Sequence, residues 1–407
     1  MNLICFGSFY LSSVFVTELS PAVTTSGGEP TLLMDFLAFF VGFLARPVGA
    51  LWFGVRGDLI SPRKAIKESI LLLIFSTALM GVLPSAPATN DLYFILLRCF
   101  QGIGLGGAYA AMAVYLYESA PADKRNRFTS WIQFSVAIGY ITALLGVVML
   151  KTIYAQEFYI KGGWRIAFFL PIAGLFFLEP FREDENQGTL VIEKAQWLRS
   201  CILTIRRQGK SWTPYLAVLI ATGILSFTAS NFKFYFMKVI LKMDPVAVDF
   251  ASGIGTILFL PFYYIGGVLA DRFGSFKICW ISVAVGCLWM FPSFKILEGA
   301  SYQSSHQTLT IAFAVASLGA ILVTGFAAMI AMLCDLFPRN MRCTLFALSY
   351  SLTVGFLGSL VHGYGIHAFQ AHGFRYAGIF LAVGIATVCV LGSAYLYFPS
   401  DSEKNHS

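Results

Sequence analysis

Long apolar runs recur along almost the whole chain, and they limit its possible folds more than any other feature. A helical run of about 20 residues is long enough to cross a hydrocarbon core of about 30 Å. Only 12% of the residues are charged and 57% are hydrophobic, which is too apolar for a soluble globule. We therefore predict an all-α integral membrane protein. Its twelve candidate spans are 3–23, 32–53, 66–86, 92–117, 129–150, 164–181, 214–236, 247–270, 277–296, 307–335, 343–367 and 375–398.

The basic residues gather in alternate loops, which indicates the orientation of the chain. Cytoplasmic loops of membrane proteins carry an excess of Lys and Arg, and Arg63, Arg125, Arg207 and Arg342 all fall on one predicted side. We expect that side, with both termini, to face the cytoplasm. The net charge of +7 then reflects membrane orientation, so the partner we expect is the lipid bilayer rather than nucleic acid.

Two short sequence motifs each occur twice in the chain. The segment Gly54–Asp58 is followed by Arg63, and it recurs as Gly267–Asp271, followed by Arg272. A second set, Glu118, Pro121 and Arg125, recurs as Asp335, Pro338 and Arg342. A membrane chain built from two similar halves is typical of a transporter, because the halves can rock about a site between them.

The repeats and the polar stretch between them predict four parts. An N-terminal six-helix bundle over 1–181 is followed by a cytoplasmic linker over 182–213, a C-terminal six-helix bundle over 214–398 and a tail over 399–407. Within the linker, Leu190–Ile205 can form an amphipathic helix on the inner leaflet, with Trp197 and Leu198 on its apolar side. The alternative, which we favour, is a basic tether that reinforces the orientation.

Several segments together resemble the major facilitator superfamily, and within it the metabolite:proton symporters that include proline/betaine permeases. The resemblance implies the major facilitator fold: twelve transmembrane helices in two pseudo-symmetric six-helix bundles. It covers nearly the whole chain. The segments that carry it are Gly42–Ala50, Leu97–Gly107, Glu118–Pro121, Gly163–Phe168 and Leu336–Arg342.

Three departures from the family pattern bear on function. The chain begins at Met1–Phe6, at or just beyond the point where related proteins carry an acidic segment that could help proton coupling. Leu59, Ser61 and Pro62 replace the residues expected in the first loop signature, and Gly358–Gly363 replaces a Pro-containing stretch. These departures leave open a uniporter, or a decayed or sensor-like carrier that binds without transport.

Arg98 is the first candidate for substrate binding. Charged side chains inside a span are costly and mark functional sites, and Arg98, Gln101 and Tyr109 share one helical face. A guanidinium suits a carboxylate because its planar fork donates two parallel hydrogen bonds. The alternative is an Arg that snorkels outward or ties helices together. Arg46 and Lys233 are further candidates, for which we favour a helix tie and a snorkelling side chain respectively.

The repeated charges are candidates for gating. Asp58 and Asp271 lie at predicted cytoplasmic helix ends, where a carboxylate can face the N-terminus of an opposing helix and bridge the halves while the inner gate is shut. The alternative is a carboxylate that is simply solvated at the interface. The same belt of candidate gating residues includes Arg63, Glu118, Arg125, Arg272, Asp335 and Arg342.

No motif for catalysis or metal binding emerges from the sequence. The spans contain no nucleophile with a neighbouring base, and His362, His367 and His372 do not align on one helical face. We therefore expect neither an enzyme nor a bound metal or organic cofactor, with the proton as the coupling ion. The resemblance implies a monomeric secondary active transporter of the bacterial inner membrane. It would import a small zwitterion or organic acid, of the proline/betaine or carboxylate type, by proton symport with alternating access.

Overall fold

The computed structural model describes residues 4–10, 41–82, 90–153, 165–181, 194–302 and 306–397, and within these ranges the chain is helical with short turns. Its contacts cluster into two compact units. Unit 1 comprises residues 1–118, 134–192 and 338–351, and unit 2 comprises 119–133, 193–337 and 352–407. Each unit therefore includes one short segment from the other predicted half of the sequence. The bundle boundaries that the sequence suggests stay a prediction.

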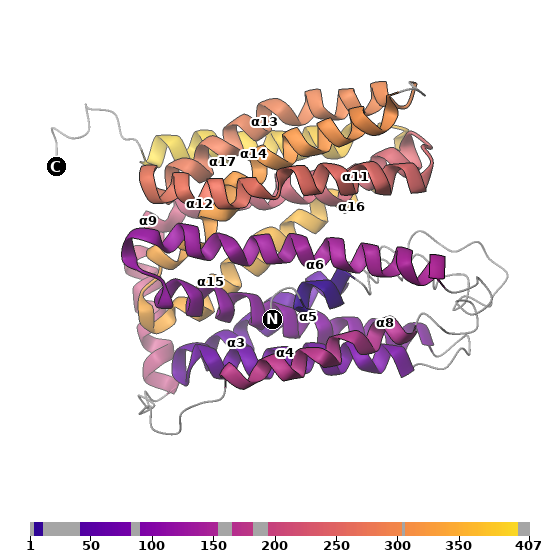
Figure 1. Ribbon diagram of the computed structural model, residues 1–407. Helices are drawn as coiled ribbons and strands as arrows, with labels where there is room; N and C mark the ends of the chain where they lie inside the picture. Colours follow the sequence, from indigo (N-terminus) through magenta and orange to yellow (C-terminus); the bar gives the residue numbers. More distant parts are fainter. Residues whose placement is uncertain are drawn as a thin grey trace. The chain divides into compact units, whose positions relative to one another are not determined.

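Unit 1 is built around α3, α4 and α5, which lie side by side (Figure 1). Small residues let α5 approach its neighbours: a Cβ at Gly102 would overlap the carbonyl of Gly42, and one at Gly106 would overlap that of Arg46. The four-residue spacing of the two glycines places both on one face of α5, which permits this close approach. The helices are α3 (Arg46–Leu59), α4 (Pro62–Val82), α5 (Asn90–Ser119, in unit 1 up to Glu118), α6 (Arg125–Ile153, in unit 1 from Phe134), α8 (Arg165–Phe169), the 3₁₀ helix η3 (Leu170–Phe181), the 3₁₀ turn η6 (Arg339–Met341) and α15 (Arg342–Tyr350).

Unit 2 is centred on α14, which packs against α11, α12 and α13. Figure 1 shows these helices running beside one another, and α17 packs on α9. The turn from α12 to α13 passes through Gly274 at φ +96°, a backbone conformation that favours glycine. The helices are η1 (Ala122–Lys124), the start of α6, α9 (Lys194–Phe227), α10 (Lys233–Tyr235), α11 (Pro245–Phe259), α12 (Pro261–Phe273), α13 (Ser275–Ala300), α14 (Gln307–Leu336), α16 (Gly358–His372) and α17 (Ala377–Tyr397).

Three short π-helical segments interrupt the helices around residues 228–240 and 351–357. They are η4 (Thr228–Phe232), η5 (Phe236–Ile240) and η7 (Ser351–Leu357). Such segments are rare and are often found at functional sites. Apolar periodicity does not reveal them, because they add a residue to a turn without changing the composition of the span.

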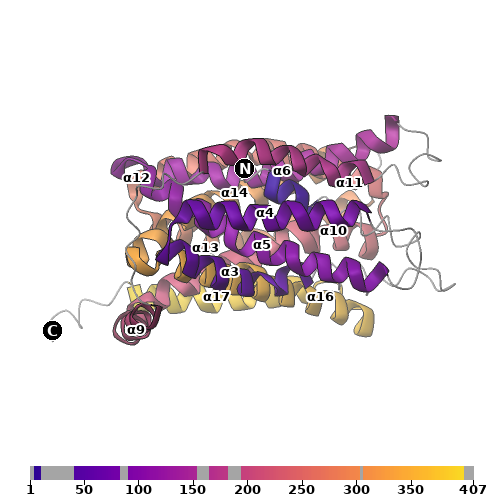
Figure 2. The ribbon, with the colours of Figure 1, turned by 90° about the horizontal axis from the view of Figure 1, so that it is seen from below.

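Helix α9 joins the end of the predicted linker to the seventh predicted span without a break. Figure 2 looks down the first turns of α9, whereas α13 and α17 lie lengthwise in the same view. Pro214 lies within this helix, where proline removes one backbone hydrogen bond and allows a bend. Of the two interpretations of this stretch, the helix, which we did not favour, is present from Lys194 onward, and residues 190–193 lie outside the described part. Its position on the inner leaflet stays a prediction. Trp197 is buried and Leu198 is 54% exposed, since consecutive helical residues point about 100° apart.

Within the described residues, eight helical segments are long and apolar enough to cross a membrane. They begin at Pro62 and end at Tyr397, and they correspond to eight of the predicted spans; the predicted spans 129–150 and 164–181 are not among them. The first predicted span is described only at residues 4–10, and the second only from residue 41. The prediction of an all-α membrane protein is confirmed.

Candidate functional site

In unit 1, Arg98 is fully buried and its guanidinium is engaged by neighbouring groups. Its Nη1 donates to the carbonyl of Phe9 at 3.1 Å and to Oε1 of Gln101 at 2.9 Å. Gln101 in turn donates to the hydroxyl of Thr77 at 2.7 Å, and the guanidinium carbon lies 4.4 Å from the ring centroid of Phe9. Arg98 thus ties α5 to α4 and to the helical segment at residues 4–10. The sequence predicted both Arg98 and Gln101 as substrate contacts, and this role stays a prediction.

A second buried guanidinium, that of Arg46 at the start of α3, has different surroundings. Only 2% of Arg46 is exposed, and its Nε and Nη2 have no hydrogen-bond partner among the described residues. Its guanidinium carbon lies 5.5 Å from the ring centroid of Phe43 and 5.3 Å from that of Tyr350. Leaving buried donors unpaired costs about 1–3 kcal/mol each, so this is an arrangement that a ligand carboxylate would relieve.

Tyr109 completes the cluster around Arg46. Its ring stacks on that of Tyr350 with centroids 4.3 Å apart, and Phe6 meets it edge-on at 5.7 Å. Tyr10 and Tyr140 also meet edge-on at 5.1 Å. Tyr350 was missed by the sequence analysis. No local signal could reveal it, because Tyr350 reaches Arg46 only through the packing of α15 on α3.

Lys233, the remaining predicted substrate contact, lies in unit 2. It is 6% exposed, and its Nζ sits 4.5 Å from the ring centroid of Phe234. It occupies the one-turn helix α10 between the π segments η4 and η5. Its predicted contact with substrate stays a prediction.

Asp58 caps a helix from the other half of the sequence. Its Oδ1 accepts from the backbone N–H of Cys343 at 2.8 Å, and its Oδ2 accepts from the N–H of Thr344 at 2.9 Å and from the Thr344 hydroxyl at 2.6 Å. These N–H groups lie in the first turn of α15, whose own N-cap residue, Met341, makes no side-chain cap. The close approach depends on Gly54, where a Cβ would lie 2.7 Å from the Cα of Thr344.

Burial and hydrogen bonding act in opposite directions on Asp58. Loss of hydration raises the pKa of its carboxyl from 3.8 to about 7, while the hydrogen bonds from Thr344 and Cys343 lower it. The burial effect is the larger. The contact therefore holds a carboxyl group that titrates near neutral pH.

Asp271, the repeat of Asp58, makes the corresponding contact in unit 2. Its carboxylate accepts from the backbone N–H groups of Asn126 at 2.9 Å and Arg127 at 3.2 Å, in the first turn of α6. The guanidinium Nε of Arg127 also lies 3.6 Å from Oδ2. The contact depends on close packing at Gly267, where a Cβ would lie 2.9 Å from the Cα of Arg127. Both predicted gating carboxylates thus hold helix starts.

The other predicted gating residues differ in how they are engaged. Glu118 accepts a hydrogen bond from Arg342 at 2.7 Å, with Arg339 at 3.6 Å. The Arg63 guanidinium lies over the ring of Tyr115 at 5.4 Å. The structure therefore joins Glu118 to Arg342 within unit 1, and a gating role for this pair stays a prediction.

Arg125, Arg272 and Asp335 all lie in unit 2. Arg125 is half-buried at the start of α6, and Arg272 is exposed with its guanidinium 5.4 Å from the ring centroid of Phe273. Asp335 is exposed and lines a pocket.

A further ion pair escaped the sequence analysis. Arg56 donates from Nε and Nη2 to the two carboxylate oxygens of Glu68 at 2.5 and 2.6 Å, joining α3 to α4. This hydrogen bonding raises the pKa of Arg56. The opposite charges on either side of the predicted loop were a signal that could have identified the pair. It fixes the turn that follows Asp58.

The described residues hold no group of three or more His, Cys, Asp or Glu side chains that could bind a metal ion. His362 is buried against Phe232, with ring centroids 5.9 Å apart. Among the described residues, the structure thus offers an aromatic cluster around a buried guanidinium in unit 1 and, in each unit, a carboxylate that holds the start of a helix distant in sequence.

Comparison with known proteins identifies the family and the fold of the chain. The family model described as Major Facilitator Superfamily matches residues 1–297. A putative proline/betaine transporter of Staphylococcus aureus (strain COL) is 25% identical over 336 residues, covering 80% of this chain and 70% of that protein. The inner membrane metabolite transport protein YhjE of Escherichia coli (strain K12) is 27% identical over 410 residues, covering 95% of this chain and 90% of that protein.

A solved structure shares the fold. The structure of the proton:xylose symporter XylE bound to 6-bromo-6-deoxy-D-glucose superimposes with a TM-score of 0.74 over 98% of this chain and 94% of that chain. Sequence identity is 15%, so this likeness concerns the fold alone. The predicted twelve-helix architecture fits it.

Proposed function

Because the chain belongs to the major facilitator superfamily, we propose that it imports a small zwitterion or organic acid, of the proline/betaine or carboxylate type, by alternating access. It is a multi-pass membrane protein of a transporter family, not an enzyme. Relatives named for proline/betaine and metabolite transport support this substrate class. We place it in a bacterial inner membrane with both termini in the cytoplasm, as the distribution of basic residues favours.

The observation that carries the proposal is the unpaired guanidinium of Arg46. A buried cation with two free donors, beside the stacked rings of Tyr109 and Tyr350, suits a carboxylate with a small organic body. A carboxylate would accept the open N–H groups, and the aromatic rings would contact an ammonium or methylated nitrogen. Arg98 would have a structural role, because its hydrogen bonds to Phe9 and Gln101 hold the neighbouring helices together.

The two carboxylate contacts fit the gating part of the mechanism. Asp58 and Asp271 each hold a helix start contributed by the opposite half of the sequence. We assign these closed contacts to an inner gate that is shut. They would break as the protein opens inward, so their strength sets the balance between the two states.

Uptake by the purified full chain in liposomes tests the proposal. Radiolabelled glycine betaine and proline are supplied with and without an inward proton gradient. Arg46→Lys keeps the charge but loses the planar fork, so we expect the apparent Kd to rise at least tenfold. Arg98→Lys is the matched control, with the same chemistry at the hydrogen-bonded guanidinium, and we expect a smaller change in Kd.

The outcomes separate the alternatives. A larger loss of binding in Arg98→Lys than in Arg46→Lys would place the substrate carboxylate at Arg98, as the sequence analysis predicted. Uptake that ignores the proton gradient would identify a uniporter, and binding without uptake would identify a sensor-like carrier. No binding of either solute by the parent protein would overturn the substrate class.

A further inference from the structure

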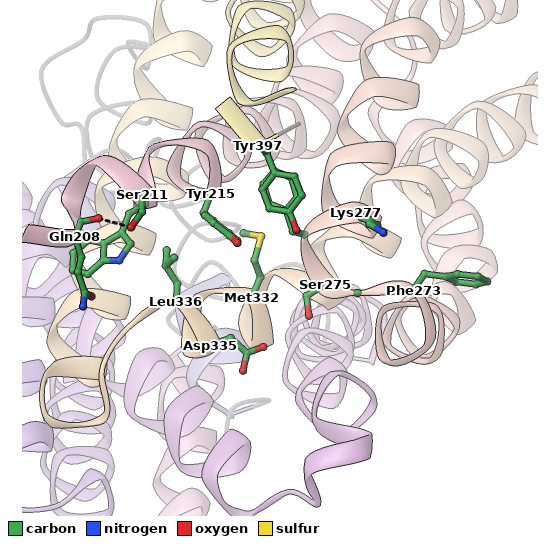
Figure 3. A pocket seen from close by; sticks show the side chains of 13 residues that line it. Gln208, Ser211, Tyr215, Phe273, Ser275, Lys277, Met332, Asp335, Leu336 and Tyr397 are labelled. Atoms are coloured by element: carbon green, nitrogen blue, oxygen red, sulfur yellow. Dashed lines mark hydrogen bonds between the residues drawn. The ribbon is translucent and has the colours of Figure 1, made fainter. Parts of the chain in front are cut away.

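Unit 2 contains a polar pocket at the end that carries Asp271. Its volume is about 460 Å³, which is enough for a molecule of amino-acid size. Helix α9, the turn from α12 to α13, and the ends of α14 and α17 form its walls (Figure 3). The residues on which the argument depends are Trp212, Tyr215, Ser275, Met332, Asp335 and Tyr397.

The polar groups at this pocket favour a positively charged ligand. Figure 3 shows the hydroxyls of Tyr215 and Tyr397 on either side of Met332, with Asp335 below Met332, whereas Lys277, which also lines the pocket, extends its ammonium group away from them. The side chain of Asp335 supplies a negative charge at the pocket wall. Two phenol oxygens and a carboxylate provide acceptors for the N–H or methyl groups of a cation.

Aromatic packing fixes the two phenols in place. Phe276 stacks on Tyr397 with ring centroids 3.9 Å apart, and Tyr215 meets Phe276 at 4.8 Å and Tyr397 at 5.9 Å. Trp212, which also lines the pocket, is buried with its ring edge-on to Phe337 at 5.2 Å. Aromatic rings attract organic cations within about 6 Å of their centroids, so this wall adds to the attraction of Asp335.

The pocket is linked by hydrogen bonds to the Asp271 contact. The hydroxyl of Ser275, in the pocket wall, donates to Oδ1 of Asn126 at 2.9 Å. The backbone N–H of the same Asn126 donates to Asp271 at 2.9 Å. A ligand that displaces Ser275 would therefore disturb Asn126, whose backbone N–H belongs to the Asp271 contact.

We propose that this pocket is a second binding site, which takes the ammonium group of a small organic solute and whose occupancy alters the Asp271 contact. The site is separate from Arg46 and does not depend on the identity of the transported substrate. Asp335 supplies the charge, and Tyr215, Phe276 and Tyr397 supply the aromatic wall. A phospholipid headgroup carries the same chemical group as a free solute, so the experiment distinguishes these two sources.

Choline is the probe, because it carries the ammonium group without a carboxylate that Arg46 could bind. The full chain is held in phosphatidylglycerol discs and titrated with choline or with acetate, while tryptophan fluorescence is recorded for the parent and for Trp212→Phe. We expect a saturable signal with choline only, and no such signal in Trp212→Phe. In Asp335→Asn the Kd for choline should rise at least tenfold, and in Tyr397→Phe at least threefold.

Asp123→Asn is the matched control, because Asp123 is an exposed carboxylate of unit 2 that does not line the pocket. It should bind choline like the parent. Choline should also change amide hydrogen exchange at Asn126 and Arg127, and leave Cys343 and Thr344 unchanged. If choline binding is then absent in phosphatidylethanolamine discs, the headgroup is the natural occupant; if it persists there, a free solute is.

The proposal is overturned if choline gives no saturable signal in the parent, or if acetate binds equally well. It is also overturned if folded Asp335→Asn and Tyr397→Phe both keep the parent Kd. Failure of the uptake experiment at Arg46 would leave these results untouched, because choline binding is measured without transport.

Discussion

The contacts of Asp58 and Asp271 share one plan but differ in how the carboxylate charge is compensated. Each carboxylate accepts from two backbone N–H groups in the first turn of a helix. Asp271 also has the guanidinium of Arg127 at 3.6 Å, whereas Asp58 has the neutral hydroxyl of Thr344. Arg127 and Thr344 occupy equivalent positions in the sequence repeat.

This difference shows how one substitution changes the chemistry of a repeated contact. A nearby guanidinium stabilises the ionised carboxylate, while a hydroxyl donates one hydrogen bond and brings no charge. Burial therefore raises the pKa of Asp58 to about 7. We infer that the Asp58 contact responds to pH and that the Asp271 contact depends on its ion pair.

Removing either carboxylate should have the largest effect. Asn has one acceptor oxygen and turns an NH2 group toward a backbone N–H, so Asp58→Asn should leave buried donors unpaired and weaken the contact by about 3 kcal/mol. Amide exchange at Cys343 and Thr344 should then speed up roughly 100-fold, since 1.4 kcal/mol is a factor of ten. The measurement is hydrogen–deuterium exchange of the purified chain, read by mass spectrometry.

Asp271→Asn is the matched variant and should act only on Asn126 and Arg127. Transport should slow in both variants by more than substrate binding weakens, because neither carboxylate belongs to the Arg46 cluster. Unchanged turnover at equal protein level in Asp58→Asn would argue decisively against a gating role.

A change of pH should distinguish the Asp58 contact from the Asp271 contact, with a smaller effect than removal of a carboxylate. The pKa of Asp58 is about 7 in the closed contact and near its ordinary 3.8 once the contact opens, so the closed state binds the proton more tightly. Lowering the pH from 8 to 5 should therefore favour closure at Asp58, by about 2.6 kcal/mol. Exchange at Cys343 and Thr344, corrected for its intrinsic pH dependence, should slow roughly 90-fold.

The corrected exchange rates at Asn126 and Arg127 provide the internal comparison for the pH experiment. Asp58→Asn should abolish the pH response at Cys343 and Thr344, because the titrating group is gone. Persistence of the response in that variant would show that another group titrates.

Substitution of Arg127 or Thr344, the residues in which the two contacts differ, should have the smallest effect. The Arg127–Asp271 pair is partly exposed, and such pairs contribute about 0.2–1 kcal/mol. Arg127→Thr should therefore speed amide exchange at Asn126 only about two- to fivefold, and Arg127→Lys should restore much of the protection. In Thr344→Arg, a nearby positive charge should lower the pKa of Asp58 and reduce its pH response. An unchanged pH response in folded Thr344→Arg would contradict the role of charge compensation.

Sequence alone predicted the fold class. An apolar run of membrane-spanning length must satisfy its backbone hydrogen bonds without water, and an α-helix does so within the segment. The spans predicted at 277–296 and 307–335 correspond to α13 (Ser275–Ala300) and α14 (Gln307–Leu336). The repeat also identified Asp58 and Asp271 as a related pair. Periodicity did not predict the π segments, and the linker was expected to be distinct from the seventh span, whereas α9 is continuous through both.

The candidate site was only partly accessible to prediction. Arg98 and Arg46 were both recognisable as buried charges, since a cation within an apolar run is conspicuous. Their ranking depends on partners far away in sequence: Phe9 and Thr77 complete the network of Arg98, while Tyr350 stands beside Arg46, whose donors stay open. The sequence thus determined which charges are placed in the membrane and which segments repeat. Tertiary structure decided which hydrogen bonds are satisfied, because that depends on which side chains packing brings within about 3 Å.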